Sequence, residues 1–138
     1  MGDGSAAPLT DTMRTLLQQL RPRSSIHLVR SFRCSPLRSA TIEYFKAVQA
    51  RTPQASSFTR LFMMPGVLHC GGGSGCDEVD WAGTIRDWVE QGEAPSRVVA
   101  RKQRGMQTVR THPLCAYPMT ARYNGAGSTD DAAAFTCR

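Results

Sequence analysis

The segment from Phe58 to Gln91 reads FTRLFMMPGVLHCGGGSGCDEVDWAGTIRDWVEQ and contains the clearest indication of the fold class. Its first seven residues form an apolar run that ends at Pro65, which is typical of a buried strand entering a turn. A glycine-rich loop follows over residues 67–77, and a helix is predicted from about Val79 onward, with Gly92 as its end. The apolar positions of this helix have helical spacing: Trp81, Ile85, Trp88 and Val89. Strand, loop and helix in this order predict an α/β fold.

Weaker patterns flank this stretch on both sides. Upstream, the sequence predicts a short amphipathic helix over 11–20, a strand over 26–29, and a helix over 40–51 with Ile42, Phe45, Val48 and Gln49 on one face. Downstream, a hairpin of strands 97–101 and 106–111 is predicted around a turn at 102–105, and the tail 112–138 has no clear period. One clear parallel-type strand cannot make a sheet alone, so we expect a piece of a larger sheet.

Composition places the chain among ordinary globular proteins. With 138 residues and 41% hydrophobic residues, it has room for one domain with a buried core. No run of about 18 apolar residues occurs, so we expect no spanning helix and no membrane partner. The first ten residues, MGDGSAAPLT, lack a basic and an apolar region, and therefore no signal peptide is predicted.

The net charge of +6 arises from one short segment. Residues 21–39 hold five arginines and no acidic residue, so the rest of the chain is close to +1. We therefore divide the chain into an atypical basic, Ser/Arg-rich segment at 1–39 and a main part at 40–138. A nucleic-acid module driven by residues 14–38 is the alternative, but aromatic residues do not interleave with the basic ones, and we expect no nucleic-acid partner.

The five cysteines form no C-x-x-C pair, which argues against a zinc ribbon or a thioredoxin-like site. A zinc site would have to draw on His69, Cys70, Cys76, His112 and Cys115. Their spacings match no standard ligand pattern, so we expect no metal and no other cofactor. Because the number of cysteines is odd, at least one thiol stays free or pairs outside the chain. Whether Cys34 pairs with Cys76 is open.

His69 is the first candidate for chemistry. It follows the predicted buried strand directly, in an open loop, and active-site groups of α/β folds gather where the carboxyl ends of strands meet such loops. An imidazole there can act as a general base, although a lone histidine more often has a structural role. The carboxylates of Asp77, Glu78 and Asp80 are expected to serve the helix N-terminus rather than the imidazole. His112 is expected on the surface or in a turn.

Two groups of motifs resemble the tannase and feruloyl esterase family over about residues 40–138. The first joins Pro65-Gly66, the run His69-Cys70-Gly71-Gly72-Gly73, the pair Asp80-Trp81 and Trp88. The second is the ending RTHPLCAYPMTARYNGAGSTDDAAAFTCR, which is similar to the closing stretch of the family. The helix ATIEYFKAVQ is also similar to the family helix that precedes the histidine strand. The resemblance implies the C-terminal portion of an α/β-hydrolase sheet with flanking helices and an irregular, disulfide-stapled tail.

The family consists of secreted enzymes that cleave esters of hydroxylated aromatic acids through a serine nucleophile. The resemblance implies that His69 is the general base and that Cys70 forms a disulfide with a cysteine beside that serine, outside this chain. It also implies a disulfide between Cys115 and Cys137. The intact enzyme is then expected to be secreted or periplasmic. Tannin-type and feruloyl-type substrates are not distinguished, and no oligomeric state is predicted.

The chain departs from the family pattern at two catalytic positions. It contains no G-x-S-x-G or Gly-Cys-Ser motif, and Ser35 beside Cys34 lacks the glycines that a nucleophile elbow needs. Where the family places its acid before a proline, Ser35 precedes Pro36 here. A frame disruption or misassigned start within residues 21–39 explains both the lost acid and the odd composition, and genuine divergence is the alternative.

We therefore expect a fragment of a carboxylic-ester hydrolase that carries the base His69, lacks nucleophile and acid, and is inactive alone. The alternative is a non-catalytic remnant or binding domain of the same fold.

Overall fold

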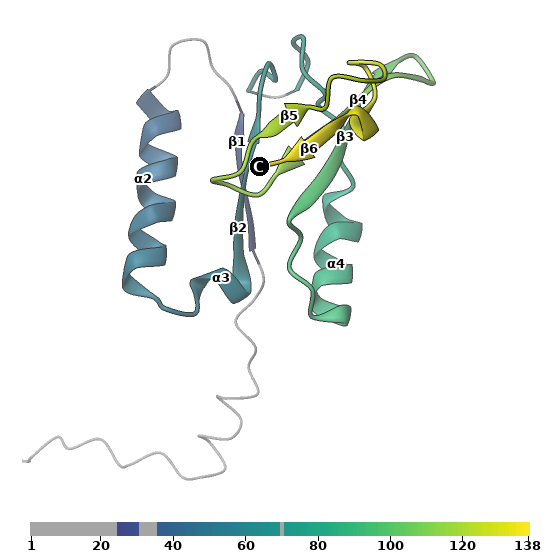
Figure 1. Cartoon of the computed structure of the whole chain (residues 1–138). Coiled ribbons are helices and arrows are strands. Elements are labelled where there is room, and N and C mark those ends of the chain that lie inside the picture. The colour runs from purple at the N-terminus through teal and green to yellow at the C-terminus, as the bar shows by residue number, and fades with distance from the viewer. Residues whose placement is uncertain (1–24, 31–35, 70) are drawn as a thin grey trace, which may run out of the picture.

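The computed structural model describes residues 25–30, 36–69 and 71–138, and side chains from residue 40 onward (Figure 1). The helices are α2 (Pro36–Arg51), α3 (Ala55–Phe58) and α4 (Trp81–Gln91), with a short 3-10 turn at Ala132–Ala134. The strands are β1 (Ser25–Arg30), β2 (Thr59–Met64), β3 (Arg97–Arg104), β4 (Gln107–Cys115), β5 (Ala121–Tyr123) and β6 (Phe135–Cys137). The expected helix at 11–20 lies outside the described residues.

A parallel pair of strands forms the centre of the fold. β1 and β2 run in register from Ser25 opposite Thr59 to Arg30 opposite Met64, and α2 lies in the connection between them. This pair confirms both predicted strands. On its other edge β2 pairs with the residues after β4, since Phe62 bridges Ala116 and the Tyr117 amide donates to the Leu61 carbonyl at 2.8 Å.

Both faces of β2 are covered, which explains its uninterrupted apolar run. Leu61 packs against Phe45 of α2, whereas Phe62 packs on the other side against Trp81, with ring centroids 5.7 Å apart. Figure 1 shows this arrangement, with α2 on one side of the parallel pair and α4 with β3 on the other. The larger core cluster lies on the second side: Phe62, Met64, Val67, Cys76, Ala100, Leu114 and Ala116.

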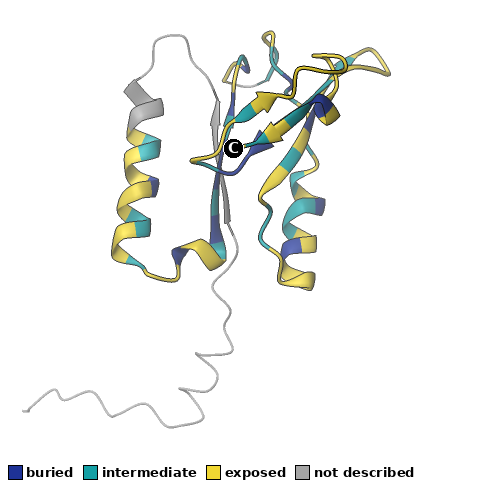
Figure 2. Ribbon diagram, in the orientation of Figure 1, coloured by how far each residue is buried: buried dark blue, intermediate teal, exposed yellow. Residues whose placement is uncertain are grey.

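Helix α2 begins at Pro36, four residues before the predicted start. Proline is favoured in the first turn of a helix because the amide it lacks has no partner there. The predicted face is confirmed: Phe45 is buried and Ile42 packs beside it, while most of the helix from residue 40 onward is exposed (Figure 2).

Helix α4 has a defined start and end. The Asp80 side chain accepts a hydrogen bond from the Gly83 amide at 2.8 Å, and Gly92 ends the helix in the left-handed region at φ 75°. Trp88 is buried, as predicted. The sequence pattern places Val89 on the same face, but Val89 is 51% exposed. The buried face of α4 is therefore narrower than the pattern predicts.

The predicted hairpin is confirmed, with longer strands that pair Arg97 with Cys115 and Arg104 with Gln107. Its turn is therefore shorter than the predicted 102–105. The tail is more ordered than its sequence indicates, because β5 and β6 form a second antiparallel pair, which contacts β4. Within the described residues, no helix has the length and apolar character needed to cross a bilayer.

Candidate functional site

The glycine-rich loop leaves the carboxyl end of β2 and folds back on itself. Val67, which is fully buried, pairs with Gly73 in an antiparallel bridge, and the Gly75 amide donates to the Gly66 carbonyl at 2.9 Å. The loop is therefore a small hairpin whose base is anchored in the core.

His69 lies near the tip of this small hairpin. The Leu68 amide donates to the Gly72 carbonyl at 3.2 Å, and the Gly71 amide donates to the Leu68 carbonyl at 3.2 Å. His69 itself is exposed. An exposed histidine thus lies in the loop that follows the carboxyl end of β2, as the sequence predicted. Cys70 lies outside the described residues, so its expected pairing stays a prediction.

Two glycines make the tight fold of the loop possible. A Cβ atom on Gly73, whose φ is +85°, would lie 2.3 Å from the Gly66 carbonyl oxygen. A Cβ atom on Gly75 would lie 2.1 Å from the Pro65 carbonyl oxygen. Both distances are far inside van der Waals contact, and therefore a larger residue would push the two sides of the loop apart.

Asp77 holds the loop from its carboxyl-terminal side. One carboxylate oxygen accepts from the Gly72 amide at 2.5 Å, and the other accepts from the Lys102 ammonium of β3 at 3.0 Å. The hydrogen bond from Gly72 is the main reason that the pKa of Asp77 is lowered, and Lys102 adds to it. Helix capping was expected of the carboxylates here. Only Asp80 caps α4, and Asp77 serves the loop instead.

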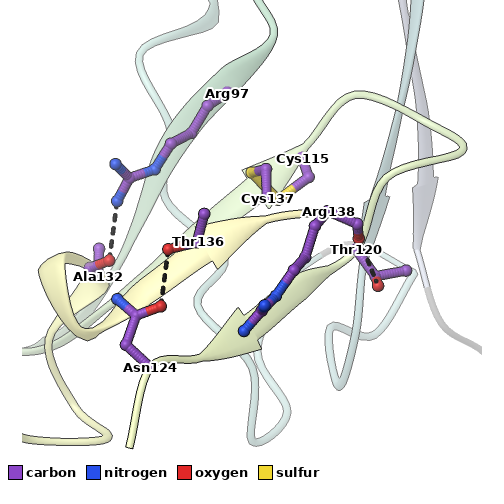
Figure 3. Close-up of a disulfide and its surroundings, with 8 residues drawn as sticks. All are labelled: Arg97, Cys115, Thr120, Asn124, Ala132, Thr136, Cys137 and Arg138. Carbon is purple, nitrogen blue, oxygen red and sulfur yellow. Dashed lines mark hydrogen bonds between the residues drawn. A yellow bond between two sulfur atoms is a disulfide. The ribbon is translucent and has the colours of Figure 1, made fainter. Parts of the chain in front are cut away.

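The tail behind the loop is closed by a disulfide. Cys115 and Cys137 are bonded, with Cα atoms 5.6 Å apart, which confirms the expected pair. Around it, the Arg97 side chain donates to the Ala132 carbonyl at 2.8 Å, and Thr136 donates to Asn124 at 2.7 Å (Figure 3). The tail is therefore held to both strands of the β3–β4 hairpin.

Cys76 and His112, the other residues considered for chemistry, do not form a site with His69. Cys76 is a buried free thiol whose pKa is raised by burial, and Cys34 lies outside the described residues, so the Cys34–Cys76 pairing gains no support. His112 was expected on the surface, but it is half-buried in β4 with its ring 4.8 Å from that of Phe135. Burial, with the charge of Arg110, lowers the pKa of His112.

The part of the chain that the structure describes contains no cluster of side chains suited to bind a metal ion. There, no three His, Cys, Asp or Glu side chains are placed to hold an ion. The Cys115 sulfur is taken up by its disulfide, which removes it from the set considered above. Sequence reasoning missed Asp77 as a loop anchor, and only its position just past the glycines hinted at that role.

A parallel strand that ends in a histidine loop, flanked by helices on both faces, is the architecture of the α/β-hydrolases. The fold matches feruloyl esterase B from Aspergillus oryzae with a TM-score of 0.69 and 21% identity, over 91% of this chain and 28% of that one. It also matches tannin acyl hydrolase from Aspergillus niger with a TM-score of 0.64 and 22% identity, over 83% of this chain and 22% of that one.

Sequence comparison gives the family. Residues 30–138 match the model of the family described as tannase and feruloyl esterase, and the chain belongs to this family. It is 42% identical over 101 residues to mono(2-hydroxyethyl) terephthalate hydrolase of Piscinibacter sakaiensis, covering 70% of this chain and 17% of that protein. It is 38% identical over 104 residues to a probable feruloyl esterase of Arthroderma benhamiae, covering 70% of this chain and 19% of that protein. The chain thus spans about a fifth of the length of these relatives.

Proposed function

We propose that this chain is the C-terminal part of a serine-type carboxylic-ester hydrolase for esters of hydroxylated aromatic acids, and that His69 is its general base. The observation that carries the proposal is the exposed imidazole of His69 on a loop leaving the carboxyl end of β2, inside the matched segment. An exposed imidazole there can reach a serine presented by a neighbouring strand of the larger sheet.

The chemistry needs groups from outside the 138 residues. His69 takes the proton of a serine hydroxyl as the oxygen attacks the ester carbonyl, then gives that proton to the leaving alcohol. Water repeats the sequence on the acyl-enzyme and releases the aromatic acid. The serine and the acid that orients His69 belong to the portion that the longer relatives have in addition. The chain alone therefore has no esterase activity.

Two further features accompany this proposal. Cys70 forms a disulfide with a cysteine next to the serine nucleophile, which ties the nucleophile to the histidine loop. The intact enzyme is secreted or periplasmic, since disulfides such as Cys115–Cys137 persist in oxidising compartments.

The test grafts residues 40–138 into the Arthroderma benhamiae protein in place of its matching segment. The purified 138-residue chain is expected to leave methyl ferulate and methyl gallate intact, whereas the chimera hydrolyses at least one of them. His69→Gln in the chimera is expected to lower kcat/KM by about 10⁴-fold, because a triad without its base loses the activated nucleophile. His112→Gln is the matched control and is expected to leave kcat/KM within about threefold, since His112 packs against Phe135 and lies beside the base of the loop, at Pro65 and Gly66, and not at the tip that carries His69.

Each result bears on a separate part of the proposal. Hydrolysis by the 138-residue chain alone would show that it contains its own nucleophile. A chimera that folds cooperatively but is inactive with His69 in place would favour the non-catalytic remnant. The ratio of rates on the two esters assigns the tannin or feruloyl preference of the segment.

A further inference from the structure

The loop that carries His69 is tied to the hairpin strand β3 by one carboxylate. Asp77 uses both of its oxygens, one for the Gly72 amide at 2.5 Å and one for the Lys102 ammonium at 3.0 Å. The side chains of Asp77 and Lys102 are 18% and 24% exposed, so solvent screens this pair much less than a surface pair. The carboxylate is therefore a fixed bridge from the loop to β3.

A short path of hydrogen bonds connects Asp77 to the residue before His69. Gly72 donates its amide to Asp77 and accepts the Leu68 amide on its carbonyl at 3.2 Å. Both backbone polar groups of this one residue at the tip are therefore engaged. Any shift of Gly72 away from Asp77 also moves Leu68, and with it the backbone that sets the direction of His69.

Asp77 is itself held in place by its two neighbours in the sequence. The next residue, Glu78, pairs with Arg101 of β3 through two backbone hydrogen bonds of 3.1 and 2.8 Å. The residue before it, Cys76, is 5% exposed and packs in the core. A side chain whose two neighbours are fixed can transmit a defined position to the group it binds.

A second charged anchor reaches the loop, but at a different point. Arg110 donates to the Ser74 carbonyl at 3.2 Å and pairs with Asp130 of the tail at 2.6 Å. Ser74 lies beyond the Val67–Gly73 bridge, at the base of the small hairpin. Asp77, in contrast, engages the tip side of that bridge through the Gly72 amide.

We propose that Asp77, with Lys102 as its partner, is the positioning residue for His69. This inference rests on the proposed function, in which His69 must point at a serine outside this chain. In this role Asp77 acts through the loop backbone. It fixes the Gly72 backbone, and through it the direction from which His69 approaches the nucleophile.

The test uses the full 138-residue chain, labelled with ¹⁵N and ¹³C, and two readouts by NMR. Asp77→Ala is expected to raise the hydrogen-exchange rate of the Gly72 amide by about tenfold or more, because the amide loses a charged acceptor. It is also expected to shift and sharpen the Cε1–Hε1 signal of His69, which His69→Gln assigns among the three histidines. Asp77→Asn keeps an acceptor oxygen and is expected to restore part of both effects.

Asp87→Ala is the matched control, since Asp87 is an exposed carboxylate of α4 paired with Arg86 at 3.2 Å. It is expected to leave both readouts unchanged. Lys102→Met removes only the partner and is expected to give a smaller change in the same direction, which keeps the test open if Asp77→Ala fails to fold. An unchanged His69 signal in a folded Asp77→Ala or Lys102→Met chain would overturn the inference, and so would an equal effect of Asp87→Ala.

The chimera separates this inference from the proposed function. An active chimera in which Asp77→Ala leaves kcat unchanged would overturn the positioning role while His69 remained the base. A folded but inactive chimera would overturn the role of His69 as base, and the NMR result on loop geometry would still stand.

Discussion

The histidine loop at 65–77 is rich in glycine and the tail at 116–138 is not, and the two segments are fixed in different ways. The tail is closed by the Cys115–Cys137 disulfide and by the pairing of β5 with β6. The described residues of the loop are held by the buried Val67, by backbone hydrogen bonds and by the Asp77 carboxylate. The segment with the proposed chemistry is thus held by contacts that pH and single substitutions can change, and the segment without it is held covalently.

The two regions also touch through one arginine. Arg110 of β4 binds the Asp130 carboxylate of the tail and the Ser74 carbonyl of the loop. The covalently closed tail therefore helps to fix the base of the loop through Arg110. The tip of the loop does not take part in this contact.

The largest expected effect comes from removing the covalent closure. Replacing Cys115 and Cys137 by serine opens a loop with a sequence separation of 22 residues. We expect the free energy of unfolding to fall by about 3 kcal/mol, because the unfolded chain regains the entropy that the crosslink removed. Urea denaturation of the two proteins, followed by circular dichroism, measures the difference. A loss below about 1 kcal/mol would mean that the β5–β6 pairing alone fixes the tail, and the contrast between the regions would disappear.

The next effect compares two glycines with nearly the same backbone conformation. Gly73 in the loop has φ +85° and Gly125 in the tail has φ +87°, but only the Gly73 position is crowded by a backbone oxygen. Alanine at Gly125 is expected to cost about 1 kcal/mol for the left-handed conformation alone. Alanine at Gly73 is expected to cost about 2 kcal/mol more, since the two sides of the loop must separate. Thermal unfolding of both variants gives the difference, and equal costs would show that the loop yields without strain.

The sequence predicted those parts of the fold that local periodicity determines. The apolar run before Pro65 is a strand covered on both faces, and the spacing of Trp81 and Trp88 placed α4 correctly. The placement of His69 at a strand end followed from the same run. The Cys115–Cys137 pair, in contrast, followed from the family resemblance, because spacing alone left the pairing open.

The features that the sequence did not predict depend on contacts between distant residues. Asp77 meets Lys102, 25 residues later, only because Glu78 pairs with β3. His112 is half-buried because Phe135 of β6 returns across β4, which no local pattern indicates. The β5–β6 pair is three residues long on each strand, too short for a period to be visible.

The smallest expected effect is the response of the loop to acid, and it separates the two kinds of closure most directly. The pKa of Asp77 is lower in the folded chain than its ordinary value, so the folded state binds fewer protons at this site than the unfolded state. The stability that the carboxylate contributes is then complete above the unfolded pKa, at about pH 4, and is lost as the pH falls through the lower folded value. We expect the native chain to be about 1 kcal/mol more stable than the Asp77→Asn chain at pH 7, and the two chains to converge as the pH falls through the folded pKa of Asp77.

Urea denaturation of the native chain and of Asp77→Asn from pH 7 down to pH 2 measures this convergence. Taking the difference between two otherwise identical chains cancels the titration of His112 and the other acids, so the loss is assigned to the Asp77 carboxylate. The contribution of the disulfide, obtained in the same way from the Cys115→Ser, Cys137→Ser chain, is expected to stay constant over this range because it contains no titrating group. If the Asp77→Asn difference also stayed constant, a neutral hydrogen bond would suffice to hold Gly72. The loop would then be as insensitive to acid as the tail, and the charge of Asp77 would have no part in directing His69.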